Sequence, residues 1–239
     1  SRQPGRNLDV LIKYRNDKRY LSVGNMLDKE NKAIYGLEFS YETIPNELNL
    51  FDYDAFKAYK GDFYCVVTNL LTCEAEYMKY TGEDRTNTVL KATCALPMLF
   101  PPIIINDTPY MDGGLTDSIP FMRALEDGCD RVLVVLTREA GYTKTTSTST
   151  KAIARYYEKE YPKLSEVMLS RAERYNECLK QLKEYEDSGK VMVIRPAVSK
   201  GFSRLEKDKN KILSMYNDGY NQGYTLTGDI KKFFNYSNS

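Results

Sequence analysis

The chain has 239 residues, which is enough for one α/β domain with its own hydrophobic core or for two small domains. Its formal net charge of +1 argues against a strongly electrostatic partner, so we expect no nucleic acid to bind. The sequence contains no histidine. These residues therefore cannot by themselves form a Ser-His-Asp triad, a Cys-His pair or a histidine-ligated zinc site.

The five cysteines lack the close spacing that is typical of metal ligands, and we interpret them as reduced thiols of a cytoplasmic protein. We expect no metal and no other cofactor. No apolar run approaches the ~18 residues that a membrane-spanning helix needs. The polar residues 1–7 do not resemble a signal peptide.

The first quarter of the chain has weak secondary-structure signals. Residues 8–22 fit either a short helix or a strand, and residues 24–36 are polar and typical of a loop. A weak strand is predicted at 36–41, and a short helix at 51–60 with its aromatic side chains on one face.

The first strong strand is Asp62–Thr68, which is rich in aromatic and β-branched residues and bounded by Gly61 and Asn69. Its continuous apolar character suggests burial on both faces, as in a parallel sheet. Residues 73–80 alternate in polarity and predict a second strand, close enough to the first to form a hairpin.

A helix is predicted at 86–95, ending before Pro97 as a proline requires. Residues 96–102 are too rich in proline for regular structure, and we expect a buried apolar loop there. A short apolar run at 103–105 and a turn at 106–109 then lead to Asp112-Gly113-Gly114.

The second half alternates between helices and aliphatic strands, and a polar, low-complexity loop at 143–151 interrupts it. This alternation predicts an α/β fold with an open, mostly parallel sheet flanked by helices on both faces, in a single domain of residues 1–239. The predicted elements are a helix at 120–127, a central parallel strand at 132–136, a long helix at 163–187, a strand at 191–194 and a helical segment at 206–236.

Asp112 is the first candidate for catalysis, because a carboxylate on a glycine turn beside apolar surface is partly desolvated. Desolvation raises the pKa of such a group and makes it a better general base. The two glycines allow positive φ angles and close approach of another segment or a ligand. The alternative is an ordinary turn acid, since Asp-Gly is a common turn dipeptide.

Other polar residues near this turn have plainer interpretations. Asp107 and Asp117 lie five residues before and after Asp112 and could join it in binding a cation, but their spacing matches no known loop, and we favour surface acids. Thr68 and Asn69 end the first strong strand, where they could line a catalytic edge, although a strand-terminating turn is the plainer role.

The nucleophile-elbow motif Gly-x-Ser-x-Gly is absent from the sequence. Ser22 has only the second glycine of the motif and Ser203 only the first. No glycine-rich phosphate loop occurs either, which disfavours a nucleotide-dependent enzyme.

Several segments together resemble the second half of a patatin-like phospholipase. They are Ala92-Thr-Cys-Ala-Leu-Pro97, Phe100-Pro-Pro102, Tyr110-Met-Asp-Gly-Gly-Leu-Thr-Asp-Ser-Ile-Pro120 and Arg131-Val-Leu-Val-Val-Leu-Thr137, with Val66-Val-Thr-Asn69 similar to the strand before the substrate edge. The resemblance is good over roughly residues 60–140.

The resemblance implies a serine acyl hydrolase with a Ser-Asp dyad, which needs no histidine. Asp112 would be the general base, Gly113 and Gly114 would hold its carboxylate in place, and Asn69 would lie with these glycines at the substrate edge. The substrate would be a lipid or another carboxylic ester, with transient contact to a membrane surface left open.

The family's serine elbow and glycine-rich oxyanion loop precede Asp-Gly-Gly, and neither is found here. Residues 1–7 resemble family sequence just after the elbow helix begins. We therefore expect the chain to be a C-terminal part of a longer patatin-like protein, lacking the first strand and the elbow and inactive by itself. Another departure from the family is Thr93, where many relatives have serine.

Two alternatives to the hydrolase remain open. The chain could be a non-catalytic α/β binding module that kept the patatin-like fold, with Asp112 as a turn acid. The charged helical region 151–187 could also serve as a lid or a partner-binding element, although a solvated helix face is the plainer interpretation.

Overall fold

The computed structural model describes residues 3–198, 201–203 and 205–235, so that Ser1, Arg2, Arg204 and residue 236 of the predicted C-terminal helix lie outside it. The contacts divide the chain into two compact units. The first comprises Ser1–Ser118 and Thr146–Arg171, and the second comprises Ile119–Thr145 and Ala172–Ser239. Each is described here by itself.

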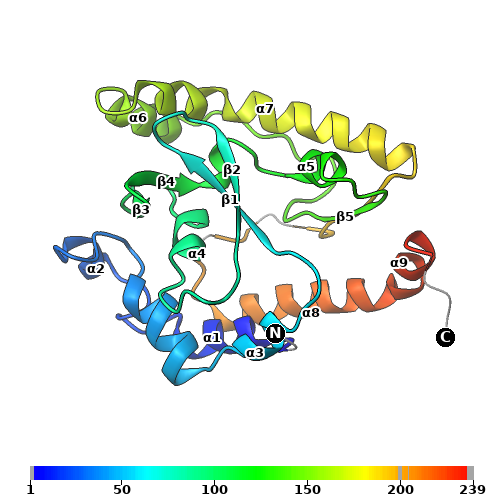
Figure 1. Ribbon diagram of the computed structural model, residues 1–239, viewed down its shortest axis with the longest axis horizontal. Helices are drawn as coiled ribbons and strands as arrows, with labels where there is room; N and C mark the ends of the chain where they lie inside the picture. Colours follow the sequence, from blue (N-terminus) through cyan, green and yellow to red (C-terminus); the bar gives the residue numbers. More distant parts are fainter. Residues whose placement is uncertain (1–2, 199–200, 204, 236–239) are drawn as a thin grey trace. The chain divides into compact units, whose positions relative to one another are not determined.

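The first unit holds a four-stranded sheet in the order β2-β1-β4-β3 (Figure 1). All three pairings are antiparallel. Its strands are β1 (Tyr64–Asn69), β2 (Ala75–Lys79), β3 (Ile103–Ile105) and β4 (Thr108–Asp112).

The antiparallel sheet differs from the mostly parallel sheet that the sequence predicts. For the pairs β1–β2 and β3–β4 the reason is the length of the connections, because strands joined by a short turn cannot run parallel. The predicted hairpin of β1 and β2 is confirmed. Asn106 and Asp107, both with positive φ, join β3 to β4 in the conformation that two-residue hairpins favour.

The helices of the first unit include two departures from the sequence prediction. The weak strand predicted at 36–41 is wrong, because the π-helix η1 begins at Phe39 and its buried Phe39 and Ile44 pack with Tyr14. The polar loop at 143–151 ends in a helix that Ser147 caps. The helical elements are α1 (Arg6–Tyr14), α2 (Val23–Leu27), η1 (Phe39–Leu48), α3 (Tyr53–Lys57), α4 (Thr88–Thr93), the 3-10 turn η2 (Gly113–Leu115), α6 (Thr148–Tyr157) and the first part of α7 (Pro162–Asp187).

Two hydrophobic clusters cover the two faces of this sheet. Met111 of β4 packs with Leu164 and Met168 of α7, whereas Tyr110 of β4 packs with Ala92 of α4. Side chains alternate between the faces of a strand, so that Asp112 projects to the same face as Tyr110, toward α4. The fold thereby places the candidate carboxylate beside the end of α4.

The second unit has a two-stranded parallel sheet of β5 (Val132–Val135) and β6 (Val191–Ile194). Residues 132–136 were predicted to form a central parallel strand: the parallel pairing is confirmed, but the described residues give β5 only one neighbour. The other elements are α5 (Phe121–Glu126), the remainder of α7, α8 (Lys209–Thr225) and α9 (Thr227–Phe233). None of the helices in the described residues is long and apolar enough to span a bilayer.

Candidate active site

Asp112 is the last residue of β4, and three hydrogen bonds fix its position. Its backbone N–H donates to the Ala95 carbonyl at 2.9 Å, and the buried Thr68 hydroxyl donates to its carbonyl at 2.8 Å. Its side-chain oxygen Oδ1 accepts from the Gly114 N–H at 2.7 Å. The carboxylate is therefore held at a defined place while the residue remains partly accessible to solvent.

Gly113 is required by a close approach of two backbones. A Cβ atom at this position would lie 2.2 Å from the Val66 carbonyl oxygen of β1. The same oxygen accepts a hydrogen bond from the Thr93 hydroxyl at 2.6 Å, so β1, the end of α4 and the Asp-Gly-Gly turn meet at one point. The predicted close approach is confirmed, but neither Gly113 nor Gly114 has a positive φ.

Gly114 lies between the candidate carboxylate and an arginine. A Cβ atom here would be 2.9 Å from Asp112 Oδ1 and 3.2 Å from Arg171 Nη2. Arg171 also donates through Nε to the Gly114 carbonyl at 2.5 Å. A guanidinium on α7 thus packs against the turn that carries Asp112.

Asn69 is buried at the end of β1, and its side chain makes structural contacts there. Its Oδ1 accepts from the N–H groups of Leu71 and Thr72, and its Nδ2 donates to Glu76 at 2.6 Å. In the register of β1 and β4, Asn69 pairs with Tyr110, two residues before Asp112. These contacts match the turn role, and substrate binding by Asn69 stays a prediction.

The acids that flank Asp112 do not form a metal site. The described residues contain no group of three or more cysteine or acidic side chains placed to hold a metal ion. Asp117 instead accepts a hydrogen bond from the Tyr77 hydroxyl at 2.7 Å, and Asp107 is one of the two positive-φ residues of the β3–β4 turn.

Cys94 directly follows α4 and interacts electrostatically with Asp112. Sequence analysis did not identify it as a residue of the candidate site. Desolvation raises the pKa of its thiol, a hydrogen bond with Tyr41 lowers it, and the negative charge of Asp112 raises it again. The residue keeps access to solvent although protein atoms crowd its thiol. The result is an uncharged thiol between Tyr41 and the candidate base.

Arg171 and Tyr41 were also missed by sequence reasoning. A signal for Arg171 was available, because it lies on the apolar stripe of α7 three residues after Met168 and four before Tyr175, where a charge is unusual. No comparable signal marks Tyr41, which lies in the segment that was predicted as a strand.

Comparison with known protein families gives two matches in different parts of the chain. Residues 8–125 match the model of the patatin-like phospholipase family, and residues 161–235 match a domain of unknown function, DUF6363. No curated protein matches the chain. The first match covers about half of the chain and includes β1, α4, β4 and Asp112-Gly113-Gly114, so this part of the chain belongs to the patatin-like phospholipase family.

Proposed function

We propose that the protein is a serine acyl hydrolase that acts on lipid or other carboxylic esters, with Asp112 as its general base. The observation that carries the proposal is the anchored carboxylate of Asp112, at the end of β4 in a domain that matches a lipid acyl hydrolase family. The family resemblance implies a serine in a Gly-x-Ser-x-Gly motif, which residues 1–239 do not contain.

Asp112 would act by moving one proton in each half of the reaction. As the serine oxygen bonds to the ester carbonyl carbon, the carboxylate takes the hydroxyl proton, and it returns this proton to the alcohol when the carbon–oxygen bond of the ester breaks. In the second half, water attacks the acyl-serine and passes its proton through the same carboxylate to the serine. The products are an alcohol and a carboxylic acid.

The hydrogen bond from the Gly114 N–H supports this role by orienting the carboxylate. The Gly114 nitrogen lies 2.7 Å from Asp112 Oδ1, so the carboxylate is already oriented before the substrate binds. Arg171 is a positioning residue in this scheme, because it acts on the turn through the Gly114 carbonyl.

The test is ester hydrolysis by the product of the complete gene, with and without the Asp112 carboxylate. We expect Asp112→Asn to lower kcat/KM for a short-chain nitrophenyl ester by at least about 100-fold, the ordinary contribution of a general base. Asp117→Asn is the matched control, since it makes the same change at a nearby acid that pairs with Tyr77.

Full activity of Asp112→Asn would contradict the proposed role. A wild-type protein that folds but hydrolyses no ester would favour the non-catalytic binding module instead. Circular dichroism of both variants excludes unfolding as the cause of a lost rate.

A further inference from the structure

Arg171 reaches the Asp-Gly-Gly turn from a part of the chain outside the patatin-like match. It belongs to α7, in the segment 161–235 that matches the domain of unknown function, whereas Asp112 lies in the segment 8–125. Both residues and the turn belong to the first unit. The candidate site is therefore built from both matched segments.

Apolar packing fixes the place of Arg171 along α7. Leu164 and Met168 of this helix are buried in one cluster with Leu115, the residue that directly follows Gly114. Positions 164, 168 and 171 lie on one face of an α-helix, because they are four and three residues apart. The packing that buries Leu164 and Met168 therefore also directs Arg171 toward the turn.

The Arg171 guanidinium lies close to the Asp112 carboxylate as well as to the Gly114 carbonyl. Its Nε donates to this carbonyl at 2.5 Å, and the same oxygen accepts from the Ser118 hydroxyl at 2.7 Å. A Cβ atom at Gly114 would be 3.2 Å from Arg171 Nη2 and 2.9 Å from Asp112 Oδ1. Nη2 and Oδ1 are thus no more than about 6 Å apart, a range in which an opposite charge favours the ionised form of a carboxylate.

Other neighbours of Asp112 oppose its ionisation. The residue projects toward α4 beside the fully buried Ala95, and apolar surroundings favour a protonated carboxyl group. The nearby Cys94 thiol supplies no compensating charge, because burial raises its pKa. Asp117 adds a second acid five residues further on, where it accepts from the Tyr77 hydroxyl. Without a cation, desolvation and the charge of Asp117 would both favour protonation of Asp112.

We propose that Arg171 is a positioning residue that keeps the Asp112 carboxylate ionised, so that the segment matching the domain of unknown function completes the candidate active site. The inference rests on the proposed function, and it adds the charge of Arg171 to the hydrogen bond that holds the turn. A general base must be deprotonated to take the serine proton, so this cation extends activity toward lower pH. Arg171 keeps its own proton throughout, because a guanidinium does not lose it in proteins.

The pH dependence of ester hydrolysis by the complete gene product tests the charge of Arg171. Arg171→Gln removes the charge but keeps an N–H group that can donate to the Gly114 carbonyl. We expect the midpoint of the acid limb of kcat/KM, which reports the base of the free enzyme, to rise by at least about one pH unit. Arg171→Lys keeps the charge and should return the midpoint to within about 0.5 pH units of the wild type.

Lys163→Gln is the matched control, because it removes the same charge from the exposed first turn of α7. Eight residues of helix place Lys163 about 12 Å from Arg171 along the axis, which exceeds the screening length in physiological salt. The midpoint of this variant should stay within about 0.3 pH units of the wild type. A lower plateau in Arg171→Gln with an unchanged midpoint would mean that Arg171 only holds the turn, and would overturn the inference.

Carbon-13 NMR titration of the Asp112 carboxyl group separates this inference from the proposed function. Loss of the resonance in Asp112→Asn identifies it. We expect Asp112 of the wild type to titrate below pH ~4, the ordinary value for an aspartate, and at a higher pH in Arg171→Gln. This result without hydrolysis of any ester would support the inference and reject the hydrolase.

Two NMR results would overturn the inference even if the protein hydrolyses esters. One is the same Asp112 titration in the wild type and in Arg171→Gln. The other is a wild-type midpoint above pH ~4, which decides the matter also where Arg171→Gln does not fold.

Discussion

Gly113 and Gly114 are neighbours at the candidate site, but different contacts exclude a side chain from each. At Gly113 the obstacle is the Val66 backbone, which is fixed in β1, a strand that pairs with β2 on one side and with β4 on the other. At Gly114 the nearest atoms are the ends of the Asp112 and Arg171 side chains, which can move. Gly113 is therefore needed for the packing of the turn against β1, and Gly114 is needed for the position of the Asp112 carboxylate.

Alanine substitutions should separate these two roles. We expect Gly113→Ala to lower the free energy of unfolding by about 3 kcal/mol, because β1 must shift to admit the methyl group. Gly114→Ala should cost less than about 1 kcal/mol but reduce ester hydrolysis, since it displaces Asp112 Oδ1. Urea denaturation and ester assays of both variants check this, and equal losses of stability would contradict it.

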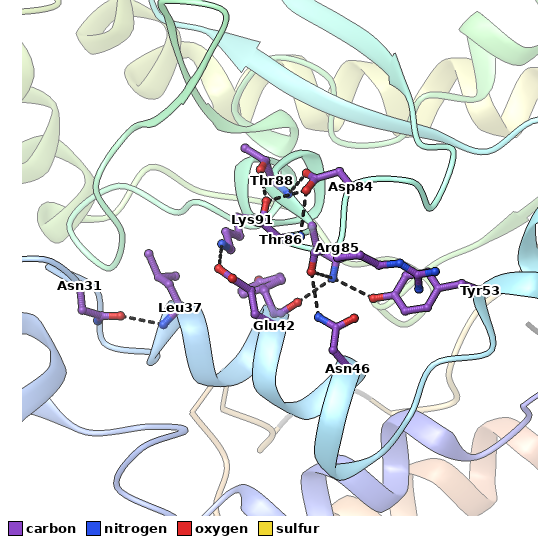
Figure 2. Close-up of polar contacts among 12 residues, drawn as sticks. Asn31, Leu37, Glu42, Asn46, Tyr53, Asp84, Arg85, Thr86, Thr88 and Lys91 are labelled. Atoms are coloured by element: carbon purple, nitrogen blue, oxygen red, sulfur yellow. Dashed lines mark hydrogen bonds and ion pairs between the residues drawn. The ribbon is translucent and has the colours of Figure 1, made fainter.

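At the scale of an element, Asp84 organises the segment that leads into α4 (Figure 2). It accepts from the N–H groups of Thr86 at 2.8 Å and Thr88 at 2.7 Å, and from the Thr86 hydroxyl at 2.6 Å. Burial alone would raise the pKa of Asp84, but these hydrogen bonds outweigh it and lower the pKa to about 2. Helix α4 covers the sheet face to which Asp112 projects. By stabilising the start of α4, the Asp84 carboxylate therefore helps to keep the candidate site in place.

A lowered pKa makes the contribution of Asp84 dependent on pH in a defined direction. Its stabilisation is complete above pH ~4, the ordinary pKa of an aspartate, and is lost as the pH falls toward 2. Because Asp84 is solvent-exposed, we expect Asp84→Ala to cost only about 1 kcal/mol at pH 7, and less at pH 3. Glu83→Ala is the control, and urea denaturation at both pH values is the measurement.

At the scale of the whole molecule, the absence of histidine leaves few side chains that titrate in the neutral range, and the shifted pKa values move other groups further from it. Hydrogen bonds lower the pKa values of Asp17, Asp28 and Glu206. Burial raises the pKa of Cys65 to about 11 and of Tyr80 to about 12. With no histidine in the chain, few groups change their charge between about pH 5.5 and 8.

The stability of residues 1–239 should therefore be flat in this range. We expect the free energy of unfolding to change by less than about 1 kcal/mol from pH 5.5 to 8, because the folded and unfolded chains bind the same number of protons. Above pH ~9 it should fall, since the buried thiol and phenol stay protonated in the folded state while the unfolded chain loses those protons. Urea denaturation across pH 5–11 measures this, and a transition near pH 6.5 would contradict it.

The local patterns of the sequence predicted most of the regular elements. The helix predicted at 163–187 corresponds to α7, and the strand predicted at 191–194 is β6. The helix at 120–127 corresponds to α5. These predictions hold because the period of apolar residues and the positions of proline and glycine act on neighbouring residues. The strand predicted at 36–41 is wrong because burial of Phe39 in a helix outweighed the local preference for a strand.

The sequence by itself determined that the protein has mixed α/β structure, and that its candidate acid lies on a glycine turn in a chain without histidine. Only the tertiary structure decided that the main sheet is antiparallel and that Arg171 meets a turn 57 residues before it. The physical reason is range: propensity and periodicity act within a few residues, whereas strand pairing and converging side chains depend on contacts between distant parts of the chain.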